Sequence, residues 1–205
     1  MTKTARQLLV AMGLIASGLT GSNPAFGAEP ERPAIRILVV NHLGRPRQDI
    51  LVRAQAEVTR IYAAAGVRLV WTDPSRTLPY LTIMIDSEQH FGTPRGAADA
   101  MGAAPAADEG NGRLAYAFYN HIEASSQHYG TDVAKVLGSV IAHEIGHLLL
   151  GRRAHAIAGI MKATWKSPDM ILIANSLLGF TNEQTRLIRS TVAEMNASHK
   201  EAVSP

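Results

Sequence analysis

Two histidines lie four positions apart in the segment His143-Glu144-Ile145-Gly146-His147, and this spacing constrains the fold more than any other feature of the chain. On an α-helix, residues four apart lie one turn above each other on the same face, so both imidazoles can reach one metal ion. Glu144 lies about 100° around the helix from His143, away from the ligand face. Such a helix can hold Zn²⁺ and place a general base next to it.

Apolar residues around this motif recur at helical spacing, which predicts an amphipathic helix with one side in the core. They are Val133, Val136, Leu137, Val140, Ile141, Ile145 and Leu148. Thr131 and Asp132 precede the run and can cap its first turn. Gly151 can end the helix, because glycine adopts the left-handed conformation at low cost. The chain can then turn back so that His155 becomes a third ligand, with one position left open for water.

This order of residues resembles the metzincin clan of zinc endopeptidases, and in particular its short, exported bacterial members. The pattern of the clan is two helical histidines, a glycine turn, a third histidine, and a downstream methionine turn beneath the metal. In this sequence Gly151, His155 and Gly159-Ile160-Met161 correspond to the last three parts. One extra residue precedes Gly151, and another separates it from His155.

The resemblance implies an α+β, zincin-like (metzincin-like) domain with a twisted mixed sheet and an active-site helix. It implies one catalytic Zn²⁺ as the cofactor, bound by three histidines: His143, His147 and His155. Glu144 is the expected catalytic residue, the general base of a zinc-dependent endopeptidase that hydrolyses peptide bonds in a peptide or protein substrate. If His155 is not the third ligand, Asp169 or Glu183 is the alternative, as in other zincin clans.

A rival interpretation is an exported zinc-binding or interaction domain that has a protease-like fold and little turnover. Glu144 argues against it, because a structural zinc site needs no base and normally fills the fourth position with another side chain.

The first 27 residues have the pattern of an export signal. Lys3 and Arg6 precede an apolar stretch at 8–19, and Ala25-Phe26-Gly27 places small residues before a cleavage point at Ala28. The apolar stretch is too short to span a bilayer comfortably. We therefore expect an exported protein, periplasmic or extracellular, with no stable membrane anchor after cleavage.

The composition of the mature chain excludes several classes of partner. Without Lys3 and Arg6 the 20 basic residues fall to 18, against 17 acidic residues, so the charge gives no argument for a nucleic-acid partner. The absence of cysteine excludes disulfides, a lipid-modified cysteine and a cysteine that masks the metal. We expect residues 28–205 to form a single metallopeptidase domain. No sequence feature defines an oligomeric state.

The other elements are predicted from apolar periodicity and turn residues. We expect strands at 34–41, 67–72, 80–86 and 113–122, and helices at 48–65 and 168–178. A terminal helix opens at 180–183, with Thr181 as its cap. The resemblance adds an edge strand at 95–101 that pairs with extended substrate.

Overall fold

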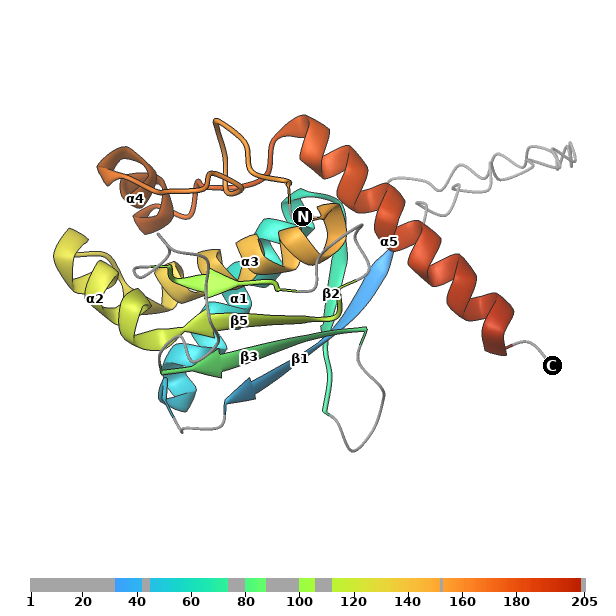
Figure 1. The fold of residues 1–205 in the computed structure, drawn as a ribbon, viewed down its shortest axis with the longest axis horizontal. Coiled ribbons are helices and arrows are strands. Elements are labelled where there is room, and N and C mark those ends of the chain that lie inside the picture. Colours follow the sequence, from blue (N-terminus) through green and yellow to red (C-terminus); the bar gives the residue numbers. More distant parts are fainter. Residues whose placement is uncertain are drawn as a thin grey trace, which may run out of the picture. The chain divides into compact units, whose positions relative to one another are not determined.

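The computed structural model describes residues 32–41, 45–73, 80–87, 100–105, 112–151 and 153–203. The predicted export signal, residues 1–27, lies outside these ranges. The elements in chain order (Figure 1) are β1 (Ala34–Asn41), α1 (Gln48–Ala64), β2 (Arg68–Trp71), β3 (Leu81–Asp86), β4 (Gly102–Ala103), β5 (Leu114–Phe118), α2 (Tyr119–Tyr129), α3 (Val133–Leu150), α4 (Ser167–Ala174) and α5 (Asn182–Val203).

The strands form one mixed sheet in the order β2-β1-β3-β5-β4. β1, β2, β3 and β5 run parallel to one another, whereas β4 runs antiparallel to β5 at the edge. Neighbouring parallel strands need a long crossover between them, and α1 provides the crossover from β1 to β2. The prediction of an α+β domain with a mixed sheet is confirmed.

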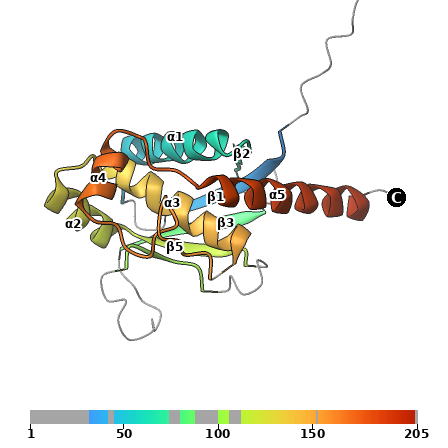
Figure 2. The same ribbon diagram turned by 90° about the horizontal axis from the view of Figure 1, so that it is seen from above.

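The core lies between the sheet and two helices, α1 and α3, which cover the same face of the sheet (Figure 2). Ile35 of β1 and Ile83 of β3 are fully buried on that face, because alternate strand residues point to the same side. Val58 and Tyr62 are buried one helical turn apart in α1. The Tyr62 hydroxyl donates to the carbonyl oxygen of Ala142 at 3.1 Å. This bond joins α1 to the half of α3 that carries the histidine motif.

The predictions for the first half of the domain agree with the structure. The strands expected at 34–41, 67–72 and 80–86 correspond to β1, β2 and β3, and the helix expected at 48–65 corresponds to α1. Residues 95–99 of the expected edge strand lie outside the described residues. One of the two edge strands of the described sheet, β4, begins at Gly102, directly after the expected range.

The strand predicted at 113–122 is too long. β5 ends at Phe118, and α2 begins at Tyr119. Tyr119, Ile122 and Ser126 are buried at helical spacing, while the residues between them are at least partly exposed. Helical periodicity replaces strand alternation here because it buries Tyr119 and Ile122 on the same side.

The last two helices differ in how well the sequence predicts their ends. α4 stops at Ala174, earlier than the predicted 168–178, and Ser176 then has a positive φ of 56° that no right-handed helix contains. Thr181 caps α5 as predicted. Its Oγ1 accepts from the Gln184 N–H at 3.3 Å, while Gln184 Oε1 accepts from the Thr181 N–H at 3.0 Å.

Candidate metal centre

α3 is a core helix that carries the histidine motif in its last two turns. Its first turn is capped by Asp132, whose carboxylate accepts from the Ala134 N–H at 2.8 Å. Among the described residues α3 alone is long and apolar enough to cross a membrane, yet 83% of it is buried inside the protein. The core of a folded domain contains helices of this kind. Burial gives the side chains of the motif a rigid support.

A turn at Gly151 ends α3 and reverses the chain. Gly151 has a φ of 90°, and its N–H donates to the His147 carbonyl oxygen at 2.9 Å. The Ala154 N–H then donates to the Gly151 carbonyl oxygen at 3.2 Å. The helix ends at Gly151 as expected, but with a ψ of 166° the residue is in an extended, positive-φ conformation open to glycine rather than in the left-handed helical one. The reversal returns His155 to the end of the helix.

The structure brings the rings of His143, His147 and His155 together, and we call them the three-histidine cluster. Nε2 of His147 lies 3.0 Å from Nε2 of His143 and 3.1 Å from Nε2 of His155. One ring nitrogen from each residue lies within 4.8 Å of the other two, so the group can hold a metal ion. Nitrogens bound about 2.0–2.1 Å from a tetrahedral ion lie about 3.3–3.4 Å apart. The observed separations are close to that requirement.

Hydrogen bonds on the far ring nitrogens define which nitrogens are free. Nδ1 of His143 lies 2.7 Å from the Ile160 carbonyl oxygen, and Nδ1 of His147 lies 3.3 Å from the Gly151 carbonyl oxygen. A carbonyl oxygen can only accept, so each Nδ1 carries the hydrogen and each Nε2 keeps a lone pair. These two lone pairs cannot hydrogen-bond to each other. A cation between them removes their repulsion, so the donor set fits a metal ion.

Burial also keeps the imidazoles uncharged. It lowers the pKa of His143 to about 4, although the hydrogen bond to Ile160 acts in the opposite direction. Burial likewise lowers the pKa of His147 and of His155. At neutral pH the three rings are therefore neutral, which is the form that binds metal.

Glu144 follows His143 on α3 but is not part of the three-histidine cluster. Its side chain is buried, and its Oε2 accepts no hydrogen bond from the described residues. Burial raises the pKa of this carboxyl group to about 8. A Cβ atom at Gly102 of β4 would lie only 2.6 Å from Glu144 Oε1. The carboxyl group therefore rests against the edge strand of the sheet.

Met161 is fully buried and packs against α3 at Gly146, the residue before His147. A Cβ atom at Gly146 would lie 2.5 Å from its Sδ, so only glycine leaves room for the sulfur there. The turn that delivers Met161 contains Gly159, with a φ of 76°, whose carbonyl oxygen accepts from the Lys162 N–H at 3.3 Å. The expected methionine turn thus lies directly against the helix of the motif.

The two carboxylates considered as alternative ligands lie apart from the cluster. Asp169 is buried, and its oxygens accept from Lys162 Nζ at 2.8 and 2.6 Å and from the Lys166 N–H at 2.8 Å. Glu183 is exposed in the first turn of α5. The structure groups His155, rather than either carboxylate, with the helical histidines.

Two residues beside the motif were missed by the sequence analysis, Trp165 and Gly102. The Trp165 Nε1–H donates to the Ile160 carbonyl oxygen at 3.2 Å, and its ring lies edge-on to the ring of His143 with 5.8 Å between centroids. Trp165 is one of two tryptophans in the chain and follows Met161 by four residues, which is a local signal. Gly102 has no such signal, because it is far from Glu144 in sequence.

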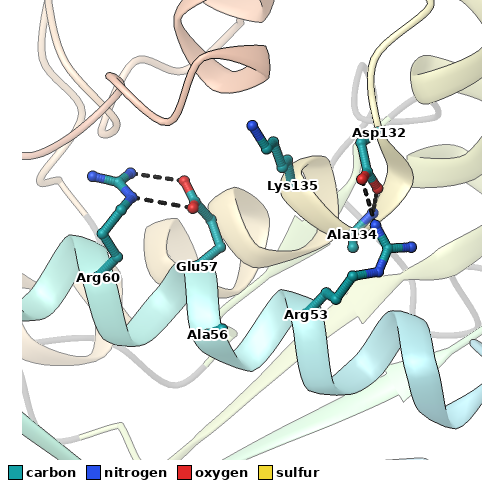
Figure 3. A pocket seen from close by; sticks show the side chains of 7 residues that line it. All are labelled: Arg53, Ala56, Glu57, Arg60, Asp132, Ala134 and Lys135. Carbon is teal, nitrogen blue, oxygen red and sulfur yellow. Dashed lines mark hydrogen bonds and ion pairs between the residues drawn. The ribbon is translucent and has the colours of Figure 1, made fainter.

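A separate group of charged residues lies in a shallow depression between α1 and α3 (Figure 3). The depression has a volume of about 310 Å³ and is lined by Arg53, Ala56, Glu57, Arg60, Asp132, Ala134 and Lys135. Arg60 pairs with Glu57 at 2.7 Å, and Arg53 pairs with Asp132. Lys135 donates to the carbonyl oxygen of Ala174. Each of the three basic side chains here has a partner within the protein. The Arg53–Asp132 pair joins α1 to the start of α3, and Lys135 joins α3 to the end of α4.

No protein-family model matches the chain, and no curated protein is significantly similar to it in sequence. These comparisons assign no family. The function is therefore argued from the residues and from the geometry of the site.

Proposed function

We propose that the protein is a zinc-dependent endopeptidase of the metzincin type with a zincin-like fold, in which His143, His147 and His155 bind one zinc ion. The observation that carries this proposal is the convergence of three imidazoles at the end of α3, the helix that also carries the buried carboxyl group of Glu144. Structural zinc sites fill all four positions with side chains, whereas catalytic sites use three and leave one open. The donor set that the described residues form has three histidines, which matches the catalytic kind.

The choice of zinc follows from the ligands. Imidazole nitrogens suit zinc, copper, iron and nickel, whereas magnesium and calcium prefer oxygen ligands. Three imidazoles with one open position are a frequent arrangement for catalytic zinc. When bound, zinc polarises a carbonyl group and lowers the pKa of water to about 7.

Glu144 is the general base of the proposed reaction. With a pKa of about 8 it holds a proton at neutral pH in the metal-free protein, and a neighbouring positive charge favours the carboxylate. The carboxylate takes a proton from the attacking water, whose oxygen adds to the carbonyl carbon of the peptide bond. Glu144 then gives this proton to the nitrogen as the carbon–nitrogen bond breaks.

β4 is the element that can align the substrate. Within the described residues it is the last strand of the sheet, and its Gly102 contacts Glu144. An extended peptide can pair with the backbone of such an edge strand, which places its peptide groups next to the base. The proposed substrate is therefore an extended or unfolded polypeptide segment.

The second candidate function is an exported zinc-binding or interaction domain with little turnover. Burial of a carboxyl oxygen that no described residue reaches, as for Glu144 Oε2, costs stability, and a binding domain gains nothing from that cost. Glu144 therefore favours the enzyme.

The test compares wild type with Glu144→Gln, and Glu123→Gln on α2 serves as the matched control. We expect all three proteins to bind equal zinc, because Glu144 is outside the ligand set. Glu144→Gln should lose turnover of a diverse peptide library by roughly 10²–10⁴-fold, since an amide cannot accept a proton from water.

Two results would count against the enzyme. Equal cleavage by wild type and Glu144→Gln would remove Glu144 as the base. A zinc-loaded wild type that cleaves nothing in the library would favour the binding domain.

A further inference from the structure

The carbonyl oxygen of Ile160 accepts two hydrogen bonds from different side chains. His143 Nδ1–H donates to it at 2.7 Å, and Trp165 Nε1–H donates to it at 3.2 Å. A carbonyl oxygen has two lone pairs, so it can accept both bonds at once. The two donors together fix the direction of the oxygen more firmly than either donor alone.

The Trp165 ring is itself held in place. Its residue is only 9% exposed, and its ring plane stands at 86° to the ring plane of His143. An edge-on contact at this distance is a favourable aromatic geometry and limits rotation of the imidazole. Trp165 therefore acts on His143 in two ways, directly through its ring and indirectly through the shared oxygen.

The orientation of His143 decides whether its Nε2 lone pair faces the rest of the three-histidine cluster. If the Ile160 oxygen moves away, Nδ1–H loses its acceptor and the ring can rotate or exchange its hydrogen between the two nitrogens. Hydrogen bonds of this kind behind a metal ligand are typically worth 10–100-fold in metal affinity.

We infer that Trp165 is a positioning residue for the metal site, which holds the Ile160 carbonyl and the His143 ring so that Nε2 of His143 faces the three-histidine cluster. The inference rests on metal binding by this cluster, as in the proposed function, but not on peptidase activity.

The other tryptophan of the chain, Trp71, serves as a control, because its indole N–H makes a comparable hydrogen bond away from the three-histidine cluster. Trp71 Nε1–H donates to Thr59 Oγ1 at 3.0 Å and joins β2 to α1. Phenylalanine keeps an aromatic ring at either position, buried at 165 and partly buried at 71, and removes one indole N–H. Loss of metal affinity through general loosening of the core would affect both variants alike.

The first experiment titrates wild type, Trp165→Phe and Trp71→Phe with Co²⁺, and then measures Zn²⁺ affinity by competition with a chelator. We expect Trp165→Phe to bind Zn²⁺ about 10-fold more weakly or worse and to change the visible Co²⁺ spectrum, as for other residues behind metal ligands. Trp71→Phe should match wild type in both. Equal affinities and spectra for the two variants overturn the inference.

A second measurement covers the case in which Trp165→Phe does not fold, and it uses Trp71→Phe, whose only indole N–H belongs to Trp165. In a ¹⁵N–¹H spectrum we expect this indole signal to shift when Zn²⁺ is added. A signal that stays in place while Zn²⁺ binds overturns the inference.

The experiment on Trp165 can fail or succeed independently of the proposed peptidase activity. A wild type that binds Zn²⁺ and cleaves no peptide still supports the role of Trp165 if Trp165→Phe weakens binding. A wild type that binds neither Co²⁺ nor Zn²⁺ overturns both.

Discussion

Glu144 is buried against β4, and one of its oxygens is reached by no donor among the described residues. Ionising a carboxyl group in this position costs more free energy than in water, so the folded, metal-free protein keeps it neutral. The unfolded chain pays no such cost. The stability of the metal-free protein must therefore depend on pH through this residue.

Glu144→Gln should reduce this pH dependence. Below its ordinary pKa of 4.5 the carboxyl group is protonated in both states, and as the pH rises towards the folded pKa of about 8 only the unfolded chain ionises. The free energy of unfolding of wild type should therefore fall relative to that of Glu144→Gln, by on the order of a few kcal/mol between about pH 5 and about pH 8. Urea unfolding of both metal-free proteins at several pH values measures this difference in the free energy of unfolding. A constant difference across this range would show that Glu144 is ionised in the folded protein.

The sequence predicts which residues form the site better than it predicts their protonation and the orientation of their rings. Spacing alone indicates that His143 and His147 share a helical face, because the period of a helix is fixed. It does not indicate which ring nitrogen carries the hydrogen. The acceptors are main-chain oxygens of Ile160 and Gly151. The glycines predict a turn at each place, but no side-chain pattern indicates the direction in which a carbonyl oxygen of the turn points.

At the scale of elements, the contact between α3 and β4 defines the environment of the proposed base. β1 and β3 could be predicted from their apolar, branched residues, because their alternate positions face the core. β4 could not be predicted in the same way. It consists of two small residues, Gly102 and Ala103, which have no periodicity, and its position follows from pairing with β5.

Gly102→Ala should displace the proposed base while leaving the metal ligands unchanged. The added Cβ would lie 2.6 Å from Glu144 Oε1, closer than atoms can approach, so the carboxyl group must move. A misplacement of about 1 Å can cost roughly 10²-fold in rate, and we expect a loss of that order with normal zinc content. Gly179→Ala is the matched control, since a Cβ there meets no atom within 4 Å. Wild-type turnover in Gly102→Ala would show that Glu144 tolerates the contact.

On the scale of the whole domain, the segment after α3 folds back onto the helices that precede it. Lys135 of α3 donates to the Ala174 carbonyl oxygen, and the Ser176 hydroxyl donates to Glu57 Oε2 of α1 at 3.0 Å. The ligands of the proposed metal site come from both α3 and this returning segment. A metal ion bound there ties the two parts together.

Zinc should therefore stabilise the whole domain against unfolding. At a free zinc concentration 100 times the Kd, binding to the folded state alone adds about 2.7 kcal/mol. We expect Tm to rise when zinc replaces EDTA, and His155→Ala to lose most of the rise because it removes one of three ligands. His128→Ala, at the end of α2 and outside the cluster, should behave as wild type. An unchanged zinc effect in His155→Ala would exclude His155 as a ligand.

Export remains a proposal, and it concerns residues 1–27, which lie outside the described ranges. We expect intact-mass analysis of periplasmic or secreted protein to give a mature amino terminus near Ala28 or Glu29, after the small residues Ala25-Phe26-Gly27. Cytoplasmic protein that retains Met1 would contradict export and the near-neutral charge of the mature chain together.

The acceptor that orients His143 is a main-chain atom, and this affects how the site can evolve. No substitution at position 160 deletes the carbonyl oxygen, so the Ile160 codon can drift among apolar residues as far as packing of this fully buried side chain permits. Mutations can therefore change the orientation of His143 only by replacing a donor to this oxygen, such as Trp165, or by altering the backbone of the turn at Gly159. A selection for altered metal preference should therefore enrich variants at Trp165 and Gly159 and leave position 160 apolar.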